Sequence, residues 1–224
     1  MSRARDMANL GAQAGSGLDA SDITSGTLGS SVVVPASVGS SLVLLKSVDT
    51  TATSTTTVEF IHGTSGVVFD STYDTYKIII SNCVPATTNK QFRSDIGTSS
   101  SGYSDNTNVG GVILFYNKAT NDDNGVTSSD FSASRCLATG GVANDIAKGG
   151  VWAELNINKP GDSSVTTTVG IPSFCHADNN GYHYGGCGFS STMANEANDR
   201  IKFYWESGVA FTKGRVSLYG VKYA

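Results

Sequence analysis

The chain has 224 residues, of which only 15 % are charged, where about 25 % is usual for a soluble domain. Its net charge of −4, with Lys and Arg scattered singly, excludes the clustered basic face that a nucleic-acid partner would need. No apolar run reaches the roughly 20 residues of a membrane span, and the first ten residues lack the apolar segment of a signal peptide. We therefore expect neither nucleic-acid binding nor membrane insertion.

Residues 1–41 differ in composition from the rest of the chain. Residues 2–9 could form two helical turns, and a tract dense in Gly, Ala and Ser follows them. Later apolar side chains recur every fifth residue, which matches neither the helix nor the strand period. Such a segment buries too little apolar surface to offset its ordering entropy, so we expect it to order only against partner chains. We call residues 1–41 the assembly arm. Its expected contact residues are Arg3, Arg5, Leu10, Leu18, Ile23 and Leu28.

From Leu42 onward, short segments rich in β-branched and aromatic residues recur between clusters of Gly, Asn, Asp and Ser, which is typical of strands and turns. Several alternate apolar and polar residues, as in 151–157, where the odd positions are apolar; this pattern indicates one buried face. We expect residues 42–224 to form one all-β domain, an antiparallel jelly-roll-like β-sandwich. The expected strands are 42–47, 57–62, 76–82, 91–96, 112–116, 151–157, 165–171, 188–192, 201–206 and 215–219.

Helical periodicity is close to absent. Residues 143–147 and 193–198 could each form one turn, and the polar segments 98–109 and 120–130 predict long loops. The four cysteines form no closely spaced pair, which favours free buried thiols and leaves disulfides open. They are Cys83, Cys136, Cys175 and Cys187.

Segment 18–28 (LDASDITSGTL) is similar to segments in tail-fibre and other virion proteins of marine and cyanobacterial tailed phages. Segments 42–46, 73–80 and 214–221 resemble a β-sandwich module of the same virion proteins. The resemblance implies a non-enzymatic virion component that is assembled in the bacterial cytoplasm as a homo-oligomer, often a trimer. It predicts a tail fibre or fibre-like subunit docked by its arm on other virion proteins. A capsid decoration (cement) protein is the alternative.

The alternatives to this interpretation are a zinc site, a serine hydrolase and a glycosidase. Cys175, His176 and Cys187 are zinc-ligand types, but neighbouring residues of a strand point to opposite faces, so the first two cannot share an ion. No Gly-x-Ser-x-Gly motif is present. Glycoside cleavage needs paired carboxylates, whereas Glu59 and Glu154 occupy polar positions of alternating strands. We expect no catalytic site, no metal and no cofactor.

Segments 101–106 and 179–185 combine tyrosines with Asn, Asp and Gly. Tyrosine rings can stack on sugars while amides and carboxylates hydrogen-bond to them, so either segment could contact a host surface glycan. An ordinary turn whose tyrosine packs against a neighbouring subunit has the same composition. The candidate receptor or subunit contacts are Tyr103, Asn106, Asn180, Tyr182 and Tyr184.

Overall fold

The computed structural model describes residues 42–51, 55–100, 102–103, 108–118, 124–131 and 135–222. In these ranges the chain forms thirteen β-strands and two 3-10 turns, Ile146–Lys148 and Glu206–Gly208. None of the described residues belongs to a helix that is long and apolar enough to cross a membrane. The predicted assembly arm and Asn106 lie outside the described residues.

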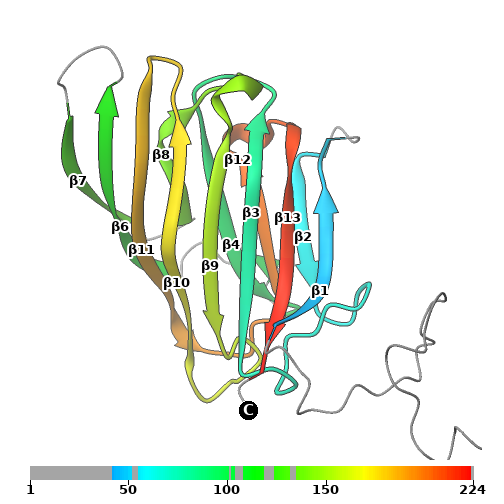
Figure 1. Ribbon diagram of the computed structural model, residues 1–224. Coiled ribbons are helices and arrows are strands. Elements are labelled where there is room, and N and C mark those ends of the chain that lie inside the picture. Colours follow the sequence, from blue (N-terminus) through cyan, green and yellow to red (C-terminus); the bar gives the residue numbers. More distant parts are fainter. Residues whose placement is uncertain are drawn as a thin grey trace, which may run out of the picture. The chain divides into compact units, whose positions relative to one another are not determined.

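The strands pair antiparallel in two sheets that face each other (Figure 1). The larger sheet contains, in spatial order, β1 (Leu42–Asp49), β13 (Phe211–Val221), β3 (Thr75–Pro85), β9 (Val151–Asn158), β10 (Thr166–Ala177), β11 (Tyr182–Asn195), β6 (Asn108–Lys118) and β7 (Asn124–Phe131). The smaller sheet contains β2 (Thr57–Ile61), β12 (Arg200–Trp205) and β4 (Lys90–Thr98), and the other edge of β4 pairs with both β5 (Gly102–Tyr103) and β8 (Arg135–Val142).

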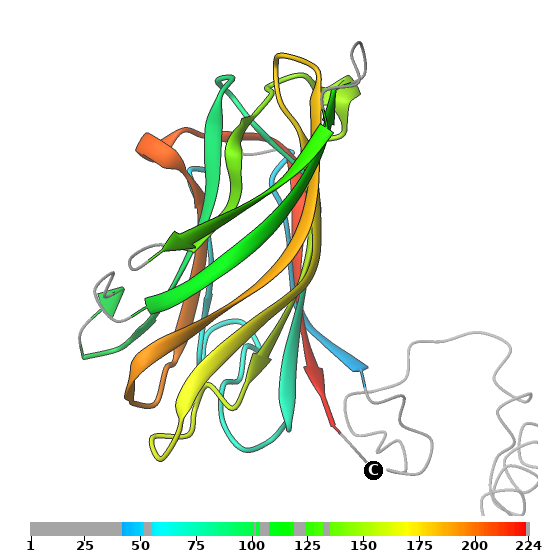
Figure 2. The same cartoon turned by 90° about the vertical axis from the view of Figure 1, so that its left-hand side faces the viewer.

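Eight of these strands make a jelly roll. The order β1-β13-β3-β9 faces the order β2-β12-β4-β8, so the predicted jelly-roll-like sandwich is confirmed. Two hairpins are inserted: β6–β7 lies between β4 and β8 in the chain, and β10–β11 lies between β9 and β12. Both extend the larger sheet beyond β9, where β11 pairs with β6. Figure 2 shows β6 and β7 crossing the open side between the two sheets.

The predicted alternation is confirmed in the core. In β9 the odd positions from Val151 to Ile157 are buried, while Trp152 and Asn156 are exposed. Aromatic side chains from the two sheets meet between them: the ring of Phe92 on β4 lies 6.0 Å from the ring of Phe211 on β13. Burying a large apolar side chain contributes about 1.5–3 kcal/mol, so this shared interior holds the sheets together.

All ten segments predicted as strands are strands in the structure. The sequence does not predict β5, β7 or β8, and the loop predicted over 120–130 is wrong from Asn124 onward, where β7 begins. Strand β7 is an edge strand of the larger sheet and most of its residues are polar, so it shows no apolar alternation. Likewise β5 and the start of β6 interrupt the loop predicted over 98–109, and β11 continues to Asn195 where a helical turn was predicted.

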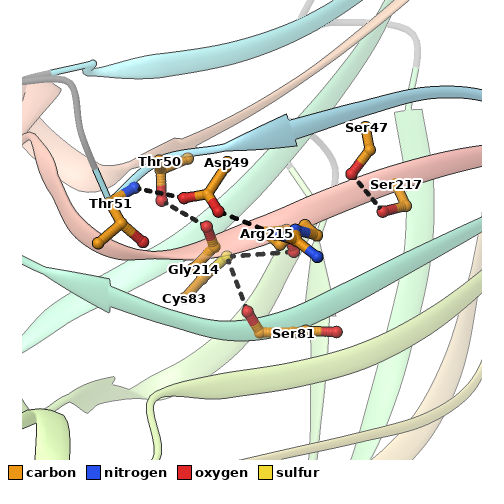
Figure 3. Close-up of polar contacts among 9 residues, drawn as sticks. All are labelled: Ser47, Asp49, Thr50, Thr51, Ser81, Cys83, Gly214, Arg215 and Ser217. Atoms are coloured by element: carbon orange, nitrogen blue, oxygen red, sulfur yellow. Dashed lines mark hydrogen bonds and ion pairs between the residues drawn. The ribbon is translucent and has the colours of Figure 1, made fainter.

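Side-chain contacts add to the ladder that joins β1 to β13 (Figure 3). Arg215 Nη2 donates to Asp49 Oδ2 at 3.0 Å. Just beyond β1, the backbone N–H and the hydroxyl of Thr50 both donate to the carbonyl oxygen of Gly214, at 2.9 and 3.0 Å. These contacts fix the register of β1, the strand that directly follows residues 1–41.

Candidate assembly surface

The outward face of β9, β10, β11 and β6 is rich in exposed apolar side chains. Among the described residues, eight large apolar side chains are exposed, and four of them share this face. Val151 and Ala153 beside Trp152, and Val112 beside Ile113, point inward and are buried, as the alternation requires. We call this surface the outer apolar face; its large side chains are Trp152 (47 % exposed), Ile113 (47 %), Phe115 (53 %) and Phe189 (59 %).

Two glycines on this face are not required by the fold of a single chain. Gly170 pairs with Phe189, and Gly185 pairs with Phe115. Neither has a positive φ, and a Cβ on Gly170 would meet only a backbone oxygen at 3.9 Å. A Cβ on Gly185 would likewise meet only a backbone oxygen, at 3.5 Å. Because glycine weakens a strand, an unforced strand glycine often marks the close approach of another backbone or a ligand.

The inward-facing glycines of the same strand differ. A Cβ on Gly186 or on Gly188 would collide with the backbone of β6. Packing within the chain therefore explains these two glycines, whereas it leaves Gly170 and Gly185 unexplained.

Beside Phe189 the outer apolar face is hollowed by a recess of about 550 Å³. None of its described lining residues is charged, and several are glycines, so an apolar group is the occupant that fits. The lining consists of Gly111, Val112, Ile113, Asn156, Gly170, Ile171, Pro172, Cys187, Gly188 and Phe189.

Two ion pairs lie on the outward side of the larger sheet. Lys77 Nζ lies 2.7 Å from Glu154 Oε1, and Arg215 Nη2 lies 3.0 Å from Asp49 Oδ2. Between β9 and β6, Glu154 is the single charged side chain at the described outward positions, and its partner lies on β3. The outer apolar face is therefore nearly neutral.

Two of the predicted contact residues, Tyr182 and Tyr184, lie at the start of β11, so the loop predicted there is wrong from residue 182 onward. The ring of Tyr184 stacks on His176, with centroids 4.8 Å apart and an interplanar angle of 9°. Asn180 is in the β10–β11 turn, where its N–H donates to Asp178 Oδ1 at 2.8 Å. Tyr182 and Tyr184 face inward, on the side opposite the outer apolar face.

Tyr116 of β6 belongs to the same aromatic cluster, with its ring 6.1 Å from those of both Tyr182 and Tyr184. The sequence gives no sign of this contact because it depends on β11 pairing with β6, which lies more than sixty residues earlier in the chain. His176 is 4 % exposed, and burial lowers its pKa to about 4, against a smaller opposing effect of the Asp178 charge. The imidazole is therefore neutral at physiological pH.

Tyr103 lies elsewhere, at the edge of the smaller sheet. Lys202 Nζ is 4.4 Å from the centre of its ring, and 3.1 Å from Oδ2 of the fully buried Asp95. Burial, and secondarily the negative charge of Glu59, raise the pKa of Tyr103. The structure thus does not bring Tyr103 together with Tyr182.

The candidate metal ligands and catalytic carboxylates do not form a site. Cys175 is exposed and His176 buried, so they occupy opposite faces of β10. In the part of the chain that the structure describes, no three His, Cys, Asp or Glu side chains are grouped to hold a metal ion. Glu59 and Asp95 lie on the two strands that flank Lys202, so their backbones are two strand spacings, about 10 Å, apart. Asp95 is fully buried, so this pair does not present two carboxylates to a substrate.

The prediction of free thiols is confirmed for Cys83, Cys175 and Cys187. Their predicted burial is correct only for Cys83, since the other two are exposed. Both exposed cysteines point outward from β10 and β11 and add to the outer apolar face. The side chain of Cys136 lies outside the described residues.

No protein-family model, no curated protein and no solved structure matches this chain. Its function is therefore inferred from the fold and from the surfaces described above.

Proposed function

We propose that this chain is a structural subunit of a tailed-phage virion, a tail fibre or fibre-like component. Its arm docks on other virion proteins and its jelly roll is presented outward. The observation that carries the proposal is the outer apolar face, because an exposed, nearly neutral apolar surface is typical of a protein that neighbours cover in an assembly.

Two further features support this role. Jelly rolls build many virus particles, although the fold alone hosts other functions as well. The low proportion of charged residues suits a subunit held between neighbours, and the segments that resemble phage virion proteins supply the class of particle. The chain then functions without a catalytic site, as a homo-oligomer and most simply as a trimer, located in the virion.

Contact with a host surface glycan is part of the same proposal. The cluster of Tyr116, Tyr182 and Tyr184 offers partly exposed rings beside the exposed Asn180 turn. We expect a Tyr182→Ala variant to lose binding to host envelope polysaccharide while its fold is retained. Unchanged binding by the variant would remove this residue from any receptor contact.

Deletion of residues 1–41 tests the docking role of the arm. In a phage that encodes the truncated chain, we expect particles that lack this protein, although the truncated chain accumulates in the infected cell. The matched control is the same phage with the full-length gene. Circular dichroism of the purified truncated chain shows whether it is folded. Incorporation of a folded, truncated chain would contradict the proposal.

Copy number in purified particles separates the two virion roles. A tail fibre is present in few copies, whereas a capsid decoration protein is present in hundreds. Quantitative mass spectrometry against the major capsid protein therefore decides between the fibre and the decoration alternative.

A further inference from the structure

We propose that copies of this chain bind one another through the outer apolar face, with apolar side chains of one copy seated over the glycines of the next. This inference rests on the proposed function, since it names the partner that covers the face in the assembly. Four observations support it.

The outer apolar face carries projections and recesses side by side. Phe189 is paired with Gly170 on β10 and with Gly111 on β6, so no side chain rises on either flank of its ring. Phe115 has a glycine on one flank, because it is paired with Gly185 on β11 and with Val126 on β7. A surface that presents both aromatic rings and apolar hollows can fit against another copy of itself, with the rings of one copy in the hollows of the other.

A contact between copies accounts for the glycines at positions 170 and 185, which packing within one chain does not. A Cβ on Gly170 or on Gly185 has free space within the chain, and neither residue needs the left-handed conformation. Larger residues at these positions would strengthen the strands. In an assembly, however, they would fill the space into which the aromatic ring of a neighbouring copy enters.

The lining of the recess agrees with this occupant. The recess measures about 550 Å³, room for more than one aromatic ring, and none of its described lining residues is charged. Aromatic side chains are the commonest anchors of protein interfaces, where they fill dry pockets near the centre of the contact. The ring of Phe189, which is 59 % exposed, is available for this role.

The charge distribution favours a second copy over a charged partner. Glu154 is the single charged side chain at the described outward positions between β9 and β6, and Lys77 neutralises it at 2.7 Å. Two such faces meet without repulsion between like charges. A nucleic acid or an acidic peptide would find no free positive charge here to bind.

The test is the mass of the full-length chain in solution, measured by light scattering and sedimentation at micromolar concentrations. We expect the wild-type chain to form a discrete oligomer. We expect Phe189→Glu and Gly170→Leu each to weaken self-association at least about thirtyfold, the loss expected of a central interface residue. The control is Val43→Glu: this side chain is 45 % exposed but lies on the other face of the larger sheet, because its pair Gly220 faces the partly buried ring of Tyr73.

Gly170→Leu separates loss of contact from loss of fold. Because its Cβ has room within the chain, the variant should unfold at the same temperature as a monomeric Phe189→Glu chain or at a higher one. A second readout is Cys187, which lines the recess and is exposed in the single chain. Its labelling by a maleimide should be slow in the wild-type oligomer and fast in both variants.

Two results would overturn the inference: a wild-type chain that stays monomeric, or an oligomer that survives both substitutions. A monomeric wild-type chain would also be the result if residues 1–41 covered the face within one molecule. A chain that is monomeric yet enters particles through its arm would refute this inference and leave the docking role of the arm standing. An oligomer that never enters particles would refute the proposed function and leave this inference standing.

Discussion

Gly214 of β13 lies so close to Cys83 of β3 that a Cβ on the glycine would stand 2.6 Å from both Cα and Sγ of the cysteine (Figure 3). The pairing of β13 with β3 shifts register between Lys213 and Arg215, and that of β3 with β9 shifts between Ile80 and Cys83. Two bulges therefore meet at this point, and the two strands can lie this close because Gly214 has no side chain. The carbonyl oxygen of Gly214 also accepts both hydrogen bonds from Thr50, so the contact joins β1, β13 and β3.

Gly214→Ala should destabilise the fold strongly. The new Cβ meets backbone of β3, and φ at this residue is +134°, which an L side chain rarely adopts. Strain and overpacking together should lower the free energy of unfolding by roughly 3 kcal/mol, measured by urea denaturation. Gly181→Ala is the control, since Gly181 also has a positive φ (+84°) but nothing within 4 Å of its Cβ position. A loss no larger than that of the control would contradict the close contact.

Cys83 should resist thiol reagents in the folded protein. Burial raises its pKa to about 12, and no solvent reaches its sulfur. In the monomeric Phe189→Glu chain at pH 8, we expect mass spectrometry to find Cys175 modified by iodoacetamide and Cys83 unmodified until denaturant is added. Modification of Cys83 at the rate of Cys175 would show that β3 and β13 separate under native conditions.

Stability should decline in mild acid because of His176. Its ordinary pKa is 6.5, and burial lowers the folded value to about 4, so the unfolded chain binds the proton first. The stabilisation is fully present above pH 6.5 and is lost progressively as the pH falls to about 4, by about 3 kcal/mol in all. His176→Phe keeps the ring stacked on Tyr184 and removes the titrating group.

The difference in unfolding free energy between His176→Phe and the wild-type chain should thus change between pH 7 and pH 4. A constant difference over that range would contradict a buried, neutral His176. Asp49, whose pKa is lowered to about 2 by hydrogen bonds from Thr51 and Arg215, affects stability only in more acidic solution.

The ion pair of Lys202 with Asp95 should contribute more to stability than the ion pair of Arg215 with Asp49. Lys202→Met leaves the fully buried carboxylate of Asp95 without its partner, which should cost about 3 kcal/mol. Arg215→Met breaks a pair whose side chains are 60 % and 49 % exposed, and should cost less than about 1 kcal/mol. Adding Asp95→Asn to the Lys202→Met variant should recover part of the loss. Equal costs for the two single variants would mean that Asp95 is solvated.

The sequence predicts the body of the fold because its interior strands alternate. In 151–157 and in 201–206 the apolar positions face one core, so period two is visible without a structure. It does not predict β7, since Asn124–Phe131 forms the outermost strand and has a polar composition. Nor does it reveal that the two inserted hairpins pair with each other through β11 and β6, because that pairing depends on backbone geometry rather than side-chain pattern.

The outer apolar face could be anticipated only in part. Phe115 and Phe189 are apolar residues within predicted strands, but the same pattern would place them in the core. The inward direction at those positions is taken by small and β-branched residues such as Gly186, Gly188 and Val112. Only the register shows that the larger side chains point outward, and only the backbone shows that Gly170 has room for a side chain that it lacks.

The pairing of Leu42 with Val221 has a mechanical consequence. The first residue of β1 and the last of β13 lie side by side, so a pull on the backbone before Leu42 against the backbone after Val221 would open the ladder one hydrogen bond at a time. A pull before Leu42 against a surface fixed on β9–β6 instead loads the bonds of β1, β13, β3 and β9 together. A subunit anchored by its arm and clamped by its outer apolar face would therefore resist tension far better than an isolated one.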